Sequence, residues 1–133
     1  MKQTNKMKME KEQGFLIFRA ASAETYLDLD FKLQVKQEIL PLITEESGSS
    51  GEPLRLLFNL QQVELINSHG ISGFLSLYDE LDVRGGILAF CSVDSLMIRN
   101  AFRSSGIEEL CADSIFPDEE TARRVLTGMT DNQ

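Results

Sequence analysis

Residues 54–70 read LRLLFNLQQVELINSHG, and this stretch decides the fold. Residues 54–60 are apolar apart from two polar positions, as is typical of a strand covered on both faces. A short apolar segment, residues 63–66, follows and leads into the polar step at residues 67–70. Apolar side chains then recur at helical spacing over residues 71–84. The sequence therefore predicts a central strand, a second short strand, a tight turn and a helix.

The helix after the turn has one apolar stripe, which we expect to face the sheet. The residues of this stripe are Phe74, Leu75, Tyr78 and Leu81. Glycines at 85–86 end the helix, and residues 87–91 (ILAFC) predict another strand. Asp94 or Ser95 can then cap a helix that ends at Gly106. Its expected buried residues are Met97, Ile98, Ala101 and Phe102.

Upstream of the central strand, residues 15–18 (FLIF) predict the first strand. Residues 27–35 alternate as a strand would, yet their apolar positions also fit one face of a helix. We expect a short strand over residues 25–28 and then a helix, which Pro41 should end or kink. Residues 47–53 contain two glycines and three serines and predict a flexible loop.

Near the C-terminus, residues 114–116 predict a last short strand, and residues 117–118 open a final helix. Strands that alternate with helices predict an α/β fold with right-handed crossovers between parallel neighbours. We expect a single domain over residues 14–127. A flexible N-terminal tail of residues 1–13 and a flexible C-terminal tail of residues 128–133 should flank it.

The composition narrows the class of protein. The chain has 133 residues, 42% of them apolar and 26% charged, which is close to the average of soluble globular domains. No apolar run approaches the ~20 residues of a membrane-spanning helix, and the N-terminal lysines precede no signal-peptide core. The net charge is -8, the wrong sign for a protein that neutralises phosphates. We therefore expect neither membrane insertion nor direct binding of nucleic acid.

Six carboxylates cluster near the C-terminus, and we interpret them as a solvated helix surface rather than an interaction face. They are Glu108, Glu109, Asp113, Asp118, Glu119 and Glu120. Cys91 and Cys111 stand in apolar sequence without a C-x-x-C spacing, and the chain has only one histidine. We therefore expect no metal site, and two reduced, buried thiols in a cytosolic protein.

Residues 54–106 resemble the STAS domain, the module of bacterial anti-sigma factor antagonists and of sulfate-transporter tails. The resemblance covers most of the chain and rests on four features in order. They are the strand before a D-[ST]-x-G-like turn (here Asn67, Ser68, His69 and Gly70), the helix after it, Gly85-Gly86, and the ending Ser104-Ser105-Gly106-Ile107. The resemblance implies a single STAS-like domain of the α/β class. It further implies a mixed β-sheet flanked by about four helices, no catalytic centre and no cofactor.

In the antagonist family, the serine or threonine after the turn aspartate is phosphorylated. The kinase is an anti-sigma factor of the histidine-kinase-like ATPase fold. By this resemblance the phosphorylated residue is Ser68. The chain departs from the family pattern at Asn67, where aspartate is usual, and at His69, where a second serine is common. These departures leave open whether the site keeps its switch. A helix N-terminus suits an added phosphate, because its free N–H groups and its dipole favour negative charge.

The turn also has simpler interpretations. Asn67 can be a turn residue and Ser68 an N-cap, without any phosphate. An enzyme with Ser68 as nucleophile and His69 as base is not expected, because neighbouring residues at a helix start point in different directions and the G-x-S-x-G elbow is missing. The glycines after the turn lack the phosphate-binding P-loop pattern.

The next helix should offer a partner a small, polar outer face. The expected contact residues are Asn67, Ser68, His69, Gly70, Ser72, Gly73 and Ser76. Three hypotheses remain open. The first is a cytoplasmic anti-sigma factor antagonist that binds an anti-sigma factor or switch serine kinase and is controlled by phosphorylation of Ser68. The second is a STAS scaffold or accessory subunit of a lipid-transport or stressosome-like complex, without a phosphorylation cycle. The third is a small hydrolase.

Overall fold

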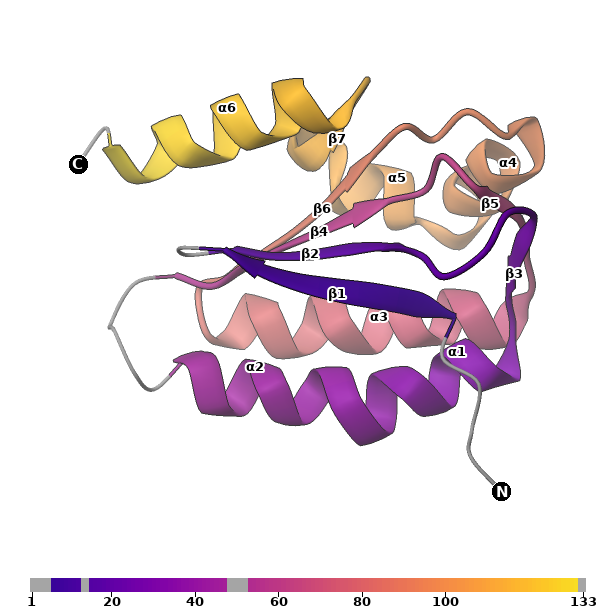
Figure 1. Cartoon of the computed structure of the whole chain (residues 1–133), viewed down its shortest axis with the longest axis horizontal. Helices are drawn as coiled ribbons and strands as arrows, with labels where there is room; N and C mark the ends of the chain where they lie inside the picture. The colour runs from indigo at the N-terminus through magenta and orange to yellow at the C-terminus, as the bar shows by residue number, and fades with distance from the viewer. Residues whose placement is uncertain (1–5, 13–14, 48–52, 132–133) are drawn as a thin grey trace.

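A mixed five-stranded sheet runs through the centre of the molecule in the order β1-β2-β4-β6-β7 (Figure 1). The computed structural model describes residues 6–12, 15–47 and 53–131. The strands of the sheet are β1 (Met7–Glu12), β2 (Phe15–Ala20), β4 (Arg55–Asn59), β6 (Ile87–Cys91) and β7 (Ile115–Phe116). β1 is antiparallel to β2, and the other neighbours are parallel. A separate parallel pair consists of β3 (Thr25–Leu27) and β5 (Val63–Ile66).

Helices cover both faces of this sheet (Figure 1). One face carries α3 (Ser68–Val83) beside a continuous helix made of α1 (Leu29–Gln34), a π-helical turn (Val35–Ile39) and α2 (Leu40–Ser47). The opposite face carries α6 (Glu119–Asp131). The chain reaches β7 through α4 (Leu96–Ser105), α5 (Ile107–Leu110) and a 3₁₀ turn (Ala112–Ser114). None of the helices in the described part of the chain is long and apolar enough to cross a membrane.

Side chains of the central strands alternate between two separate cores, because a strand has a two-residue period. On β4, Leu56 and Phe58 enter the larger core beneath α1 and α3, whereas Leu57 faces α6. The smaller core, between the sheet and α6, consists of Phe15, Ile17, Leu57, Ala89, Cys91, Ala122 and Leu126. β4 is the middle strand of the sheet, which confirms the predicted central strand and the α/β class.

Six phenylalanine rings form a continuous series of contacts in the larger core. They are Phe18, Phe31, Phe58, Phe74, Phe90 and Phe102. Phe18 and Phe58 stack with their centroids 4.5 Å apart. Phe74 of α3 contacts four other rings at centroid distances between 5.0 and 5.9 Å. These contacts fix the position of α3 on the sheet.

The buried stripe of α3 differs in part from the predicted one. Phe74 and Leu81 are buried as predicted, together with Leu77, but Leu75 and Tyr78 are only partly buried. Because α3 packs against α1 as well as against the sheet, its buried side is centred on Phe74, Leu77 and Leu81. Leu75 lies roughly 120° around the helix from that centre. Leu75 and Tyr78 still pack against the larger core, but at its margin.

α4 begins and ends as the sequence predicts. Ser95 is its N-cap, whose Oγ accepts a hydrogen bond from the N–H of Ile98 at 3.4 Å, and Gly106 closes it at φ 89°. Ile98 and Phe102 are buried, but the predicted burial of Met97 is wrong, since 60% of its surface is exposed. The buried pair lies four residues apart on one side of the helix, and the neighbouring position points away from it.

Pro41 does not end the helix in which it lies. The helix continues through Pro41 as far as Ser47. Just before the proline, the N–H of Leu40 bonds to the carbonyl of Val35, five residues back. This π-helical turn absorbs the proline, which lacks an N–H and crowds the preceding turn. Residue 47 of the predicted loop is helical, and residues 48–52 lie outside the described residues.

Both predicted flexible tails are wrong where the structure describes them. β1 occupies residues 7–12, where Met7 is buried at 1% exposure. α6 continues to Asp131, so residues 128–131 are helical. Residues 1–5, 13, 132 and 133 lie outside the described residues. Residues 7–12 form a strand because β2 provides their backbone groups with hydrogen-bond partners, which the amino-acid composition does not indicate.

Candidate functional site

The turn between β5 and α3 is a tightly capped helix start. Asn67 is the N-cap of α3, and its Oδ1 accepts hydrogen bonds from the N–H groups of His69 at 2.9 Å and Gly70 at 3.2 Å. Its carbonyl accepts the first intrahelical bond, from the N–H of Ile71. The cap is therefore Asn67 and not Ser68. Ser68 is the first helical residue, and its side chain is exposed.

Gly70 anchors this turn to the neighbouring strand β3. It is buried, and a Cβ there would lie 2.4 Å from the carbonyl oxygen of Leu27. The N–H of Asn67 donates to the same carbonyl at 3.1 Å. One turn later, a Cβ on Gly73 would meet the side chains of Phe31 and Val35 at 3.3 Å. The two glycines bring α3 close to α1 and hold the start of α3 beside β3.

The predicted contact residues divide into exposed and buried ones. Ser68, His69 and Ser76 are exposed, and Asn67 and Ser72 are partly buried. Gly70 and Gly73 are buried beneath α1 and β3, so the prediction that they contact a partner is wrong. Their role is to let the helices pack closely. The exposed side chains near Ser68 therefore lie on one side of α3, and the two glycines lie on the side that packs against β3 and α1.

Two apolar side chains beside this turn were missed by the sequence analysis. Tyr26 of β3 is 40% exposed and Leu29, the first residue of α1, is 47% exposed. They belong to the surface around the turn because β3 pairs with β5, with Leu27 opposite Ile66. The alternation of residues 27–35 included Leu29 but did not show its neighbours, because only the pairing of β3 with β5 places β3 and the start of α1 beside the turn.

The start of α1 lies at the same end of the molecule as the start of α3 (Figure 1). Asp28 caps α1 by accepting from the N–H of Asp30 at 3.1 Å, and its carboxylate pairs with Lys6 Nζ at 3.6 Å. Two helix N-termini therefore lie next to each other, and the α1 terminus already has its own carboxylate. The α3 terminus is capped by the neutral amide of Asn67, so its cap does not repel an added negative charge and the helix dipole favours one.

A catalytic arrangement of Ser68 and His69 is not found among the described residues. In the described ranges, no hydrogen bond joins the Ser68 hydroxyl to the His69 imidazole, and no carboxylate orients that imidazole. The described residues also hold no group of three metal-ligating side chains. Cys91 and Cys111 are buried free thiols, and burial raises their pKa to about 12 and about 11. Both thiols are therefore protonated and unreactive at neutral pH.

A cleft of about 410 Å³ lies between α4 and β7. Both arginines of the cleft have partners within the chain: Arg99 Nε donates to the carbonyl of Val93 at 2.8 Å, and Arg103 Nε lies 3.7 Å from a carboxylate oxygen of Glu108. Asp94 adds a further negative charge to the lining. The mixed charge gives the cleft no bias toward an anionic ligand.

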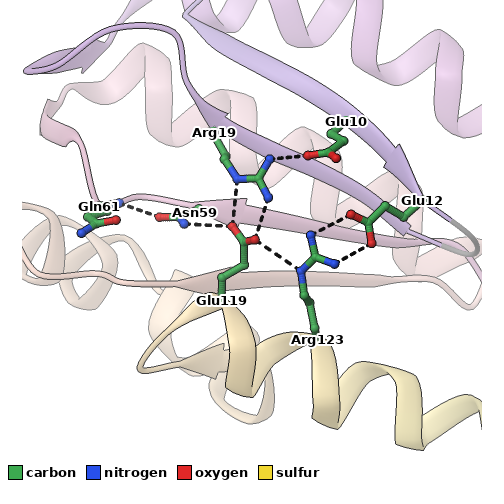
Figure 2. A network of polar contacts seen from close by, with 7 residues as sticks. All are labelled: Glu10, Glu12, Arg19, Asn59, Gln61, Glu119 and Arg123. Atoms are coloured by element: carbon green, nitrogen blue, oxygen red, sulfur yellow. Dashed lines mark hydrogen bonds and ion pairs between the residues drawn. The ribbon is translucent and has the colours of Figure 1, made fainter.

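A second polar centre, which the sequence analysis missed, joins α6 to the sheet (Figure 2). Glu119 of α6 accepts hydrogen bonds from Arg19 Nε at 3.0 Å and Nη2 at 2.6 Å, and from Asn59 Nδ2 at 3.0 Å. Arg123 binds both carboxylate oxygens of Glu12, at 2.6 and 2.7 Å. The hydrogen bond from Arg19 lowers the pKa of Glu119 to about 2. The interpretation of all six C-terminal carboxylates as a solvated surface is therefore wrong for Glu119.

With the strand-turn-helix and its cap established, the comparisons with known proteins identify the family. The family model of the STAS domain matches residues 6–122. The chain belongs to the STAS domain family. No curated protein matches the sequence of this STAS domain.

Solved structures of two kinds share its fold. The anti-sigma factor antagonist SpoIIAA in its unphosphorylated form is 17% identical over 90% of this chain and 96% of its own, with a TM-score of 0.64. The phosphorylated form of SpoIIAA, a Bacillus cell fate determinant, is 18% identical over 90% of this chain and 98% of its own, also with a TM-score of 0.64. A sulfate transporter family protein from Wolinella succinogenes is 16% identical over 90% of each chain, with a TM-score of 0.70. At these identities the likeness shows the fold alone.

Proposed function

We propose that this STAS domain is a cytoplasmic, non-enzymatic regulator that binds an anti-sigma factor or switch serine kinase and is controlled by phosphorylation of Ser68. The observation that carries the proposal is the position of Ser68 at the start of α3. Its side chain is exposed there, and in the described part of the chain its hydroxyl makes no hydrogen bond. A kinase can therefore reach this hydroxyl without unfolding the helix.

The electrostatics of the turn favour a phosphate within the monomer. Asn67 satisfies the N–H groups of His69 and Gly70 and adds no charge, so a phosphate on Ser68 meets the positive end of the α3 dipole. The modification adds a charge of about -1.5 to -2 at neutral pH. We therefore expect it to leave the fold intact and to act on the complex.

The surroundings of Ser68 explain how such a charge would release a partner. Tyr26 and Leu29 offer exposed apolar surface next to the turn, and a partner that covers them removes water from the same region. A phosphate buried in that contact loses its hydration without compensation unless the partner supplies cations. The existence of SpoIIAA in a phosphorylated and an unphosphorylated form is consistent with this proposal for a related fold.

The experiment incubates the purified protein with ATP and a switch kinase of the histidine-kinase-like ATPase fold encoded beside it, and locates added phosphate by mass spectrometry. We expect one phosphate, on Ser68, and none on Ser68→Ala. The matched control is Ser76→Ala, which removes another exposed serine of α3 and should leave phosphorylation unchanged. Phosphate on Ser76, or none on a chain that binds the kinase, would contradict the proposal.

Binding provides the second readout. Phosphorylated protein should bind the kinase roughly tenfold more weakly or worse, a difference of about 1.4 kcal/mol, while Ser68→Ala binds like the unmodified chain. Asn67→Asp keeps an N-cap and restores the residue usual in the family, so it tests whether asparagine slows phosphorylation. Equal affinity of the phosphorylated and unmodified chains would favour the scaffold or accessory-subunit alternative.

A further inference from the structure

β1 is one edge of the five-stranded sheet, and among the described strands it pairs with β2 alone. The N–H of Ala21 donates to the carbonyl of Lys6 at 2.9 Å, and this bond fixes which backbone groups of the strand face β2. In an antiparallel strand, successive residues direct their N–H and C=O groups to opposite sides. The carbonyl of Lys6 and the backbone groups of Lys8, Glu10 and Glu12 therefore face β2, whereas the N–H of Lys6 donates to Gln34 Oε1 at 3.1 Å. The groups of Met7, Met9 and Lys11 face away from β2.

One of these three outward positions is already occupied by a side chain. Gln34 of α1, itself buried, accepts a hydrogen bond from the N–H of Met7 at 3.1 Å and donates to the carbonyl of Met7 at 2.7 Å. Gln34 thus takes the place of a neighbouring strand at this end of β1. In the part of the chain that the structure describes, the outward N–H and C=O groups of Met9 and Lys11 have no partner.

We propose that a second copy of this chain pairs with these groups, so that two β1 strands meet antiparallel about a two-fold axis. Met9 of each copy lies opposite Lys11 of the other. This register satisfies all four unpaired groups of each edge and forms four hydrogen bonds between the copies. It also joins the two sheets into one continuous sheet. The inference goes beyond the proposed function, because it involves neither Ser68 nor α3.

Gln34 selects this register among the possible ones. A shift that places Met9 opposite Met9 brings Lys11 opposite Met7, whose backbone groups Gln34 already binds. Lys11 would then remain unpaired. A shift in the other direction places Lys11 opposite Lys11 and Met9 opposite residue 13, which lies outside the described residues. Among the described residues of β1, only the pairing of Met9 with Lys11 uses every free group.

The charges of β1 agree with the same register. Lys8 of each copy lies opposite Glu12 of the other, and opposite charges across a strand pair attract. Glu10 meets its own copy near the axis, but Arg19 forms an ion pair with Glu10 within each copy and offsets that repulsion. On the face of β1 that carries residues 8, 10 and 12, Lys8 lies at one end and Glu12 at the other, so an antiparallel copy places these two opposite each other. Met9, 43% exposed, adds apolar contact.

The first experiment measures the mass of the purified protein in solution by sedimentation at about 100 μM, where weak interfaces become populated. We expect a dimer. Met9→Pro removes only an outward N–H, which an edge strand tolerates, and should give a folded monomer with an unchanged circular dichroism spectrum. The matched control, Met9→Thr, keeps the N–H and should remain dimeric. A monomeric wild type, or a Met9→Pro dimer, would overturn the proposal.

The second experiment tests the register by exchanging charges. Lys8→Glu and Glu12→Lys each place two like-charged pairs across the interface, so each variant alone should be at least tenfold weaker as a dimer. A mixture of the two variants restores opposite charges at both pairs and should form a heterodimer. Thermal melting verifies that Glu12→Lys, which loses its contact with Arg123, stays folded. Failure of the mixture to associate would exclude this register, and a monomer that instead captures a strand of another protein would exclude the second copy as the occupant.

Discussion

On the α3 side of the sheet, six phenylalanine rings contact one another, and Phe74 touches four of them. On the α6 side the apolar core is much smaller, and Glu119 and Arg123 add charged contacts to β1, β2 and β4 (Figure 2). The two faces of one sheet are thus held by different interactions. Apolar burial scales with area, whereas partly exposed ion pairs contribute little and respond to pH and salt.

This difference assigns different roles to the two faces. The α3 side carries the turn at Ser68, so a rigid aromatic core positions the proposed switch. The α6 side ties the edge strand β1 to the C-terminal helix through Glu12 and Arg123. We expect the largest changes in stability on the first side and the pH-dependent changes on the second. Four substitutions test this expectation, in order of decreasing effect.

Phe74→Ala should cause the greatest loss of stability. It removes a fully buried ring from the centre of the aromatic core and should lower the free energy of unfolding by about 3–5 kcal/mol. Urea unfolding measures the loss as a lower midpoint at an unchanged slope. Leu126→Ala, on the α6 side, should cost less, toward the lower end of about 2–5 kcal/mol. A greater loss for Leu126→Ala would reverse the comparison between the two faces.

Gly70→Ala should come next, with a loss of about 1–3 kcal/mol from overpacking. The new methyl group would lie 2.4 Å from the carbonyl oxygen of Leu27, so the start of α3 must move away from β3. Gly73→Ala is the graded control, since its nearest neighbours at 3.3 Å are side chains that can shift. Melting temperatures should rank wild type, Gly73→Ala and Gly70→Ala in falling order. An unchanged Gly70→Ala protein would mean that this contact does not hold the turn.

Glu119→Gln should have a smaller effect that depends on pH. The pKa of Glu119 is about 2 in the folded protein, below its ordinary value of 4.5, mainly because Arg19 donates hydrogen bonds to it. Because the pKa of Glu119 is lowered on folding, its ionised carboxylate stabilises the fold fully at pH values above about 4.5. This contribution is lost as the pH falls toward 2. At neutral pH the substitution should cost about 1–2 kcal/mol after solvent screening.

The measurement compares chemical unfolding of the wild type and Glu119→Gln across this pH range. Their difference should shrink below pH 4.5, the ordinary pKa of the carboxylate. Glu120→Gln, which changes the adjacent exposed carboxylate, should show neither the loss nor this pH dependence. A difference between wild type and Glu119→Gln that stays constant with pH would show that the pairing with Arg19 does not stabilise the fold.

Gly128→Ala should have the smallest effect and the opposite sign. Gly128 lies within α6, and a Cβ there would meet no atom within 4 Å. Alanine in a helix interior is more stable than glycine by about 0.5–1 kcal/mol. The melting temperature should therefore rise slightly. A decrease would indicate that α6 contacts the sheet more tightly at this position than the structure shows.

Local patterns in the sequence predicted most of the secondary structure. Residues 54–60 predicted the middle strand because a strand covered on both faces must be apolar on both. Ser95 and Gly106 marked the ends of α4, since capping depends on the chemistry of single residues. The polar turn before α3 was visible for the same reason, although the cap is Asn67 and not Ser68. The motif order also indicated the STAS family, which the family model confirms.

The features that the sequence analysis missed depend on partners far away along the chain. Residues 7–12 form a strand because β2 and Gln34 provide hydrogen-bond partners for their backbone groups. Glu119 is paired because the fold brings Arg19, 100 residues away along the chain, within hydrogen-bond distance of it. Gly70 is buried because Leu27 approaches it, which its sequence neighbours do not indicate. The sequence by itself thus determined periodicity, caps and family, all of which are local. Only the tertiary structure decided which polar and backbone groups meet, because hydrogen bonds and burial depend on distance in space and not on separation along the chain.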